Sequence, residues 1–263
     1  MKAFFKIRLY HFKKHLYANC SWLIAIYFRH FYTPKKRTIT SIFDQYSKQA
    51  KQRVNIIQIG GNDGFHNDPV CRFVKRDHWK GVILEPQKNV FPTLAYVYKQ
   101  NDITPLNKAI AKESGSIILY KIAFSQARWA TGLASFNKAA ILSAIESGYV
   151  RKRALKDGTE LPNNMEDYIS EEIVETTSFE DLIINHQLGP INILQIDVEG
   201  FDFEVIKMIN LNSIAPDLVS YEHEKLSNED QKQAKYLLKS KGYKIIAMNR
   251  DTVAHKAELQ FEV

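Results

Sequence analysis

The sequence contains very little cysteine, with only Cys20 and Cys71 among its 263 residues. The two lie far apart in unrelated sequence contexts. This excludes a disulfide framework and a zinc site built from paired cysteines. Because such a chain suits a reducing compartment, we expect a cytoplasmic protein.

Acidic residues are missing from the N-terminal segment. Nine lysines and arginines lie between Met1 and Arg37, and the first acidic residue is Asp44. The whole chain has a formal net charge of +7, so the remainder carries 7 − 9 = −2. Because the basicity is confined to one end, we predict no basic groove for nucleic acid and no nucleic-acid partner.

The N-terminal segment also lacks a long apolar run. Its uncharged stretch, residues 16–28, is shorter than the roughly 20 residues that span a bilayer, and no small-residue signal cleavage site follows. Aromatic residues between basic flanks fit a helix lying in an anionic membrane interface, which would make the protein peripheral at the cytoplasmic face of the inner membrane. A helix packed on the catalytic domain or on a dimer partner fits equally well. The sequence indicates no oligomeric state.

Beyond residue 50, β-rich apolar runs alternate with segments of helical periodicity, which predicts an α/β fold with a mostly parallel sheet covered by helices. The expected strands are residues 54–59, 81–84, 103–110, a hairpin strand at 115–122, 173–176, 191–198, 217–224, and a final pair at 243–248 and 258–263. The expected helices are residues 67–78, 89–100, 177–187 with Thr177 as its cap, 201–209 and 227–242. We therefore expect a basic helical arm over residues 1–50 and one domain over 51–263. Residues 125–172 break the rhythm and are expected to form a lid or an acceptor-binding insertion.

A glycine turn follows the first expected strand in the sequence IQIGGNDG, which contains Gly60, Gly61, Asn62, Asp63 and Gly64. In open α/β sheets, ligands lie beyond the carboxyl ends of strands, where a glycine turn lets them approach the backbone. The spacing is not the G-x-G-x-x-G of dinucleotide sites, and Asp63 would repel a pyrophosphate. A ligand with a cationic centre and no phosphate fits this turn better.

Glu85 ends the second expected strand in the sequence GVILEP. A carboxylate at this position accepts hydrogen bonds from the ribose hydroxyls of an adenosine. Alone, the glycine turn or Glu85 could be structural. Together, in this order, they favour S-adenosylmethionine over a nicotinamide cofactor.

Five segments resemble the FkbM family of S-adenosylmethionine-dependent methyltransferases: IQIGGNDG, GVILEP, NKAIAKESGSIILY, TTSFEDLI and, most specifically, ILQIDVEGFDFEVIKMI. The resemblance implies a class I, Rossmann-like methyltransferase fold and methyl transfer, usually to a hydroxyl of a natural product or a surface glycan. A role in polysaccharide biosynthesis would follow from such an acceptor. The resemblance does not cover the arm or the insertion.

The resemblance also implies positions for the cofactor. The segment from Gly60 to Gly64, with Gly61 and Asn62, would pass beneath the methionine part, and Asp63 would hold its ammonium group. Glu85 would bind the ribose, and the segment starting at Asn107 would lie along the adenine. Asp197 would sit between the methyl donor and the acceptor. Gln58 departs from the family pattern, since many such enzymes carry an acid there.

Methyl transfer to a hydroxyl also needs a proton acceptor. The candidates are Asp197 and Glu199 of DVEG, and Glu222, His223 and Glu224 of SYEHEK. We predict His223 and Asp197 as catalytic, because a histidine is largely neutral near pH 7. Glu199 could instead cap the next helix. The same carboxylates could hold a divalent cation, but no ligand spacing supports a metal site.

Two stretches of the insertion carry further expectations. Arg128, Trp129 and Ser135 could grip a glycan or a phosphate, or merely dock the insertion on the sheet. The run RKRALK, residues 151–156, is predicted to be solvated surface, or at best a contact for an acidic carrier. Three functions remain open: an O-methyltransferase acting on a glycan, glycolipid or related natural product, a nicotinamide-dependent oxidoreductase, and a non-catalytic, membrane-associated interaction protein.

Overall fold

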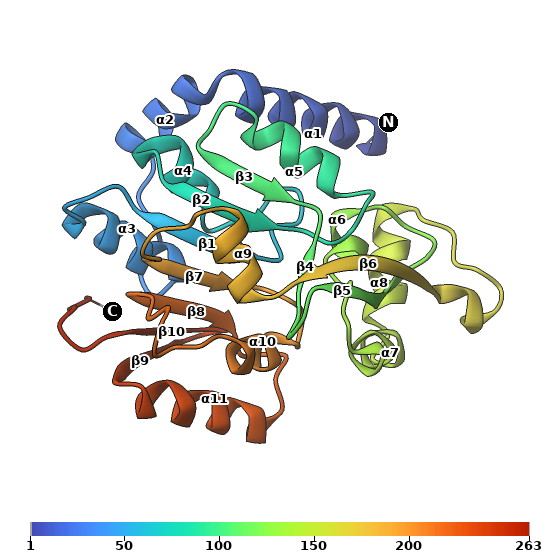
Figure 1. Ribbon diagram of the computed structural model, residues 1–263. Helices are drawn as coiled ribbons and strands as arrows, with labels where there is room; N and C mark the ends of the chain where they lie inside the picture. Colours follow the sequence, from blue (N-terminus) through green and yellow to red (C-terminus); the bar gives the residue numbers. More distant parts are fainter. Residues whose placement is uncertain (1, 263) are drawn as a thin grey trace.

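The computed structural model describes residues 2–262 and is organised around a seven-stranded sheet (Figure 1). Its strands are β1 (Asn55–Ile59), β2 (Lys80–Leu84), β3 (Ile103–Leu106), β7 (Ile193–Ile196), β8 (Leu218–Glu222), β9 (Tyr243–Met248) and β10 (Asp251–Lys256). Their order is β3-β2-β1-β7-β8-β10-β9. Strand β10 is antiparallel to both neighbours, and the remaining pairs are parallel. This order confirms the expected Rossmann-like methyltransferase fold with its C-terminal antiparallel pair.

Helices cover both faces of this sheet, which explains why every residue of β1 is buried. The helices of one face are α3 (Ile39–Gln49), α4 (Cys71–Asp77) and α5 (Phe91–Tyr98), and those of the other are α9 (Phe179–Asn185), α10 (Asp202–Met208) and α11 (Asn228–Ser240). Side chains of β1 alternate between the two cores, with Ile56 packed in the first and Ile57 in the second.

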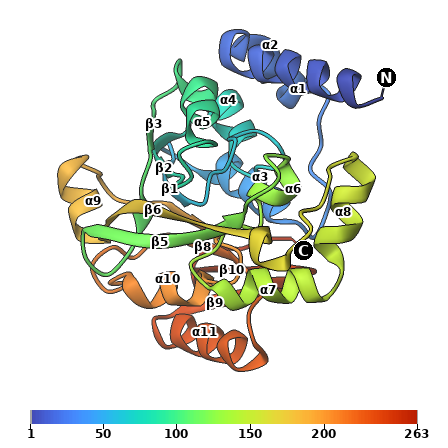
Figure 2. The ribbon, with the colours of Figure 1, turned by 90° about the vertical axis from the view of Figure 1, so that its right-hand side faces the viewer.

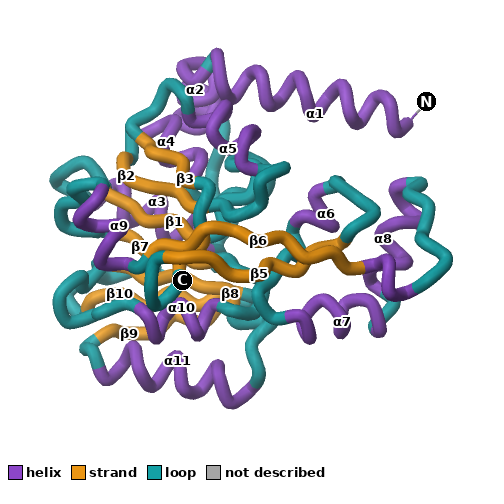
Figure 3. Tube along the Cα trace, turned by 45° about the vertical axis from the view of Figure 1, so that its right-hand side comes forward, coloured by secondary structure: helices purple, strands orange, loops and turns teal. Residues whose placement is uncertain are grey.

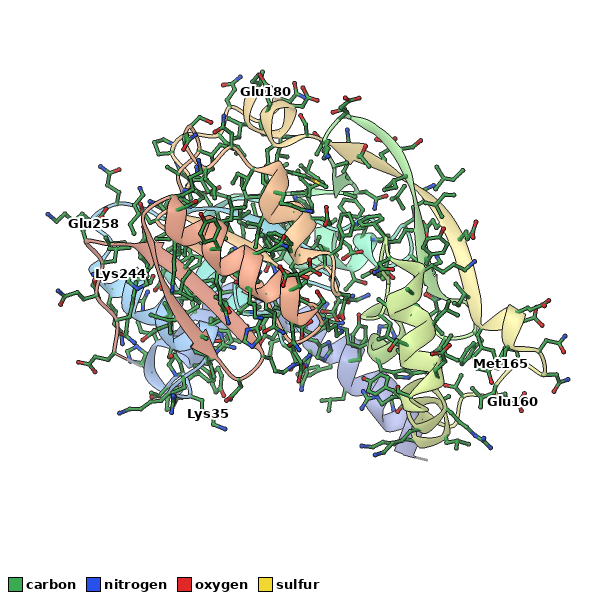
Figure 4. The ribbon with its side chains drawn as sticks, turned by 90° about the horizontal axis from the view of Figure 1, so that it is seen from below. Lys35, Glu160, Met165, Glu180, Lys244 and Glu258 are labelled. Carbon is green, nitrogen blue, oxygen red and sulfur yellow. The ribbon has the colours of Figure 1, made fainter. Side chains whose placement is uncertain are left out.

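A second, three-stranded sheet carries the insertion. It consists of β4 (Ala109–Ile110), β5 (Gly115–Ile122) and β6 (Ile169–Thr177), and β6 lies in the middle. Between β5 and β6 come α6 (Arg128–Thr131), α7 (Lys138–Glu146), α8 (Tyr149–Asp157) and the 3-10 helix η1 (Met165–Tyr168). These elements share a small apolar core of their own. They lie beyond the carboxyl ends of the parallel strands (Figures 1 and 3), and Glu160 and Met165 mark their outer end in Figure 4.

The N-terminal arm consists of α1 (Lys2–Asn19) and α2 (Ser21–His30). It lies along one edge of the molecule, beside α4 and α5 and remote from α11 (Figure 2). No helix among the described residues is both long and apolar enough to cross a membrane. The arm packs on the domain through α4 and α5, which agrees with the expectation of a helix packed on the catalytic domain.

Three expected elements differ from the structure. The expected strand 103–110 is interrupted at Asn107, whose side-chain amide donates to the backbone carbonyls of Glu85 (2.8 Å) and Pro86 (3.0 Å). Strand β5 does not form a hairpin with the preceding strand. It pairs along its whole length with β6, because β4 is only two residues long. The cap of α9 is Ser178 and not Thr177, because the Ser178 hydroxyl accepts from the backbone N–H of Asp181 at 3.0 Å.

The end of the chain also differs from the expectation. The partner of β9 is β10, and residues 258–262 form no strand. This tail lies beside α3. The Gln45 side chain on that helix accepts from the backbone N–H of Glu262 (2.8 Å) and donates to its backbone C=O (2.9 Å). Val263, the last residue of the expected strand, lies outside the described residues.

Candidate functional site

The glycine turn after β1 is held by the chain's own hydrogen bonds. The N–H groups of Gly60 and Gly61 both donate to the carbonyl of Leu84, at 3.0 and 2.9 Å. Gly60 has φ +84°, and a Cβ added there would lie 1.9 Å from the carbonyl oxygen of Asp197. Only glycine therefore allows the ends of β1 and β7 to approach this closely. Because these first N–H groups already donate to Leu84, they are not free to bind an anion.

The Asp63 carboxylate turns toward its own loop. Its Oδ1 accepts from the N–H groups of Phe65 (3.3 Å) and His66 (3.0 Å), and its Oδ2 lies 2.8 Å from His66 Nδ1. Asp63 is buried and is not among the residues that line the cavities described below. Its expected contact with a methionine ammonium group therefore stays a prediction.

Gln58, at the position where relatives often carry an acid, contacts an acid from elsewhere in the chain. Its Nε2 donates to Asp68 Oδ2 at 3.0 Å. The other oxygen of Asp68 accepts from the N–H groups of Val70 and Cys71, both at 2.7 Å, where α4 begins. These bonds explain why the helix begins at Cys71 and not at residue 67.

Glu85 lies at the carboxyl end of β2 with only 2% of its surface exposed. Its Oε2 accepts from the N–H of Asn62 (2.8 Å), and its Oε1 accepts from the N–H of Gln87 (2.9 Å). Burial raises the pKa of this carboxyl, while these hydrogen bonds oppose the rise. Oε1 also accepts from the side-chain amide of Gln87 at 3.1 Å, so the remaining lone pair for a ligand hydroxyl is on Oε2.

A narrow cavity joins the residues that the sequence analysis identified. Gly60, Asn62, Glu85 and Asp197 line it from the sheet, and residues 131–136 of the insertion cover it. An apolar slot continues from it, with walls formed by Pro86, Ile110, Phe136 and Val198 together with Lys108 and Ala109. Asn107 itself lines neither space, although its amide holds the turn after β2.

A larger cavity of about 380 Å³ adjoins the narrow one. Asp197, Glu199 and Arg128 line both spaces, so the two meet at the end of β7. Burial raises the pKa of Asp197, while the positive charges of Arg128, Lys225 and Arg250 oppose the rise. Asp197 therefore lies where the two cavities meet, and its expected position between a methyl donor and an acceptor stays a prediction.

The sheet side of the larger cavity is a cluster of acids and bases. The carboxylate of Glu199 pairs with Lys225, and that of Glu222 pairs with Arg250. Burial and the charge of Asp197 raise the pKa of Glu222 to about 7, and burial lowers the pKa of Lys225 to about 8. Glu199 does not cap α10, whose N-cap is Phe201. This cavity therefore holds groups that can exchange protons near neutral pH.

His223 does not reach this cluster. Its Nδ1 lies 3.0 Å from the Thr252 hydroxyl, its backbone N–H donates to the Arg250 carbonyl, and it lines neither cavity. Burial, followed by the nearby charge of Lys235, lowers its pKa. The side chain of Glu222, one residue earlier, faces the cavity instead. Successive residues of an extended chain point to opposite sides, and the sequence alone does not show which of the two sides faces the cavity.

The insertion contributes two arginines. Arg128 lies on α6 and Arg153 on α8, and each has a buried Nε atom without a hydrogen-bond partner in the described part of the chain. Among residues 2–262, no carboxylate lies within 4.0 Å of either guanidinium. Arg153 belongs to the run RKRALK, whose Arg151, Lys152 and Lys156 are exposed as predicted, whereas Arg153 is half-buried and lines the larger cavity. Its helical spacing from the buried Val150 was the signal that could have revealed this.

Asp202 was not identified from the sequence as a site residue. It is fully buried, and its oxygens accept from the N–H groups of Gly200 and Glu222, each at 3.2 Å. It thereby links the ends of β7 and β8. Burial and the charges of Asp197 and Glu222 raise its pKa well above the usual value.

In the part of the chain that the structure covers, no cluster of acids, histidines and cysteines has a geometry that could hold a metal ion.

Comparisons with known proteins agree with this geometry. The family described as "Methyltransferase FkbM domain" matches residues 58–245. A search of curated proteins found no match. Methyltransferase FkbM from Methylobacillus flagellatus has a similar structure, with 11% identity, a TM-score of 0.50 and coverage of 88% of this chain and 50% of that one. The chain thus spans half the length of that protein.

Two other solved structures match with lower scores. An O-methyltransferase from Bacillus cereus in complex with SAH is 10% identical over 91% of this chain and 90% of that one, with a TM-score of 0.42. A precorrin-6y C5,15-methyltransferase from Geobacter metallireducens is 10% identical over 87% and 95%, with a TM-score of 0.39. The family match, which covers more than half of the sequence, decides the assignment: this chain belongs to the FkbM family of S-adenosylmethionine-dependent methyltransferases.

Proposed function

We propose that this chain transfers a methyl group from S-adenosylmethionine to a hydroxyl oxygen of a glycan, a glycolipid or a related natural product. The observation that carries the proposal is the position of Asp197. It lines both the narrow cavity, which contains the Glu85 carboxylate, and the larger cavity, which contains the acid and base cluster. A donor bound in the first would present its methyl group toward the second.

The chemistry of the residues around the narrow cavity suits an adenosine, and the cavity, about 40 Å³, would have to widen to admit one. The Glu85 carboxylate would accept the ribose hydroxyls, Gly60 and Asn62 would form the floor, and the apolar slot beside Ile110 and Phe136 would take the adenine. Asn107 would position this slot through the turn after β2, without contacting the adenine itself. When bound, S-adenosylmethionine supplies an electrophilic methyl group on a sulfonium centre. Gly64 lies against Leu94 and Tyr98, and Asp63 bonds its own loop, so both would act on the turn and not on the ligand.

The larger cavity fits the acceptor. Trp129 and Tyr149 offer aromatic surface, and Asp197, Glu222 and Arg250 offer polar groups for hydroxyls. Since the donor is already activated, the chain's contribution is to align the acceptor oxygen and to remove its proton. Asp197, at the junction of the cavities, would accept that proton. Lys225 and Arg250 hold the surrounding carboxylates in place.

The experiment that tests the acceptor class uses labelled S-adenosylmethionine. Purified full-length protein is incubated with cell extracts, and the labelled product is identified by mass spectrometry. We expect a methyl ether on a sugar or natural-product hydroxyl. Label appearing only on nitrogen, on carbon, on protein or on nucleic acid would refute the O-methylation part of the proposal.

Arg128 is expected to bind the carboxylate of the methionine part. Its guanidinium is the cation shared by the two cavities, and it has no carboxylate partner in the described structure. Replacing Arg128 by Gln should weaken binding of S-adenosylhomocysteine about 10- to 100-fold, since a hydrogen bond between charged groups contributes about 1.5–3 kcal/mol. Calorimetry with methylthioadenosine, which lacks the amino-acid part, should show a change of less than about twofold.

Arg153→Gln is the matched control, because Arg153 lines only the larger cavity. It should leave binding of both nucleosides unchanged. If Arg128→Gln weakened both nucleosides equally, the change would reflect a displaced insertion, and the assignment of Arg128 would be wrong.

A further inference from the structure

The arm has one face that packs on the domain and one that faces solvent. The packed face includes the buried side chains of Ala18, Ile24 and Phe28. Tyr17 contacts Phe65 at a ring distance of 5.3 Å, and Asn19 donates to the Tyr96 hydroxyl at 2.7 Å. The arm is therefore fixed on the domain, and its outer face has a defined orientation.

The outer face of the arm is apolar and aromatic. We use this name for the exposed side chains of Phe12, Trp22, Leu23, Ile26, Tyr27 and Phe31. Phe31 is 75% exposed, and Phe12 and Trp22 are each 63% exposed. Trp22 and Ile26 are one helical turn apart, as are Leu23 and Tyr27, so these four form a continuous stripe on α2. A contiguous apolar surface of this kind marks an interaction site, unlike a single exposed side chain.

The charge around this face has one sign. The segment before Asp44 contains nine lysines and arginines and no acidic residue. Lys13 is exposed on α1, and Lys35 and Lys36 are exposed in the segment between α2 and α3. The remaining chain has 36 − 9 = 27 basic residues against 29 acidic ones, so the excess positive charge of the molecule is concentrated in the arm. Two arms facing each other would repel.

We propose that the outer face of the arm docks on a lipid bilayer that contains anionic headgroups. The aromatic and aliphatic side chains would enter the interface between headgroups and acyl chains, and the lysines would contact the headgroups. Each basic residue near an anionic surface contributes about 1 kcal/mol, and this contribution falls with salt. This binding is independent of the donor site and of the acceptor.

The test uses the full-length protein with vesicles of phosphatidylcholine alone or mixed with phosphatidylglycerol. Flotation should recover the protein with the mixed vesicles only, and salt should weaken the recovery. The fluorescence of Trp22 also reports on membrane insertion, because the other two tryptophans, Trp79 and Trp129, are buried, with 1% and 6% exposed. Insertion of Trp22 should shift the fluorescence maximum to shorter wavelength.

Two variants separate the apolar and the charged contributions. Trp22→Ser/Phe31→Ser and Lys13→Glu/Lys35→Glu/Lys36→Glu should each lower vesicle partitioning at least tenfold. The matched control is Lys232→Glu/Lys239→Glu/Lys241→Glu, which makes the same charge change on and after α11, and it should change partitioning less than twofold. Unchanged thermal unfolding and S-adenosylhomocysteine binding would establish that each variant is folded.

Three results would overturn the proposal. The wild-type protein could fail to float with the anionic vesicles, or the control triple variant could lose partitioning as strongly as the arm variants. The wild-type protein could also fail to bind the vesicles and sediment as a dimer, with Trp22→Ser/Phe31→Ser sedimenting as a monomer. That last result would assign the outer face to a second copy of the chain.

Discussion

Replacing Glu85 by Ala is expected to raise the dissociation constant for S-adenosylhomocysteine at least 100-fold. The buried carboxylate at the end of β2 would accept the two ribose hydroxyls, with the Gln87 side-chain amide giving up its bond to Oε1, and each charged hydrogen bond contributes about 1.5–3 kcal/mol. Two such bonds correspond to roughly 3–6 kcal/mol, and each 1.4 kcal/mol is a factor of ten in affinity. Isothermal titration calorimetry with purified protein measures the change directly.

This substitution also removes two internal acceptors. The N–H groups of Asn62 and Gln87 would lose the bonds that Glu85 now accepts, so the variant should unfold at a lower temperature. Thermal unfolding without ligand must therefore accompany the titration. Glu175→Gln, at an exposed position on β6, is the control and should retain wild-type affinity. A folded Glu85→Ala variant with wild-type affinity would show that the ribose does not contact this residue.

Replacing Asp197 by Asn is expected to lower kcat about 10²- to 10⁴-fold, the usual contribution of a positioned proton acceptor. The amide has a similar shape but cannot accept the proton of the acceptor hydroxyl. Binding of S-adenosylhomocysteine should fall by a much smaller factor, because Glu85 and the glycine floor remain. The measurement is the rate of labelled methyl transfer to the acceptor that the extract experiment identifies.

His223→Ala provides the contrast, because His223 lines neither cavity. We expect its kcat to stay within about twofold of wild type. If His223→Ala abolished transfer and Asp197→Asn did not, the prediction made from the sequence would be right, and the assignment made from the geometry would be wrong.

The pH dependence of transfer should follow the same carboxylates. A carboxyl group accepts a proton only when it is ionised, so kcat should fall as the pH drops through the pKa of the cluster. Burial and the charge of Asp197 raise the pKa of Glu222 to about 7. We therefore expect kcat to rise between about pH 6 and 8, the range that brackets this pKa. In Asp197→Asn the pKa of Glu222 should fall, because a repelling charge is lost. A rate independent of pH over this range would contradict the role of the cluster.

Sequence patterns located the sheet and the strand ends around the narrow cavity well. The apolar runs ending in Gly60, Glu85 and Asp197 each became a strand whose carboxyl end lines the narrow cavity. This worked because parallel strands buried on both faces have strong apolar patterns, and their carboxyl ends share one edge. The segment from Asn107 to Ala109 was predicted to lie along the adenine; Lys108 and Ala109 line the apolar slot, whereas Asn107 does not and instead supports the turn after β2 through hydrogen bonds.

The acceptor half depends on contacts between distant segments, which local patterns do not encode. Arg153 reaches the larger cavity because α8 folds back over the strand ends, while its own sequence resembles an exposed basic run. His223 and Glu222 are neighbours in the chain, and the twist and pairing of β8 with β10 decide which one faces the cavity. The partner of β5 is β6, and β6 starts 47 residues after β5 ends (169 − 122 = 47). Local sequence patterns do not predict a pairing over that separation.

The most direct test of the account is a titration of the unmodified full-length protein with S-adenosylhomocysteine, followed by calorimetry, with NAD titrated in parallel. The family assignment and the Glu85 site predict saturable binding of S-adenosylhomocysteine at one site for each chain and no saturable heat with NAD. No binding of S-adenosylhomocysteine, or saturable binding of NAD that S-adenosylhomocysteine does not displace, would contradict the proposal that this chain uses the narrow cavity for a methyl donor.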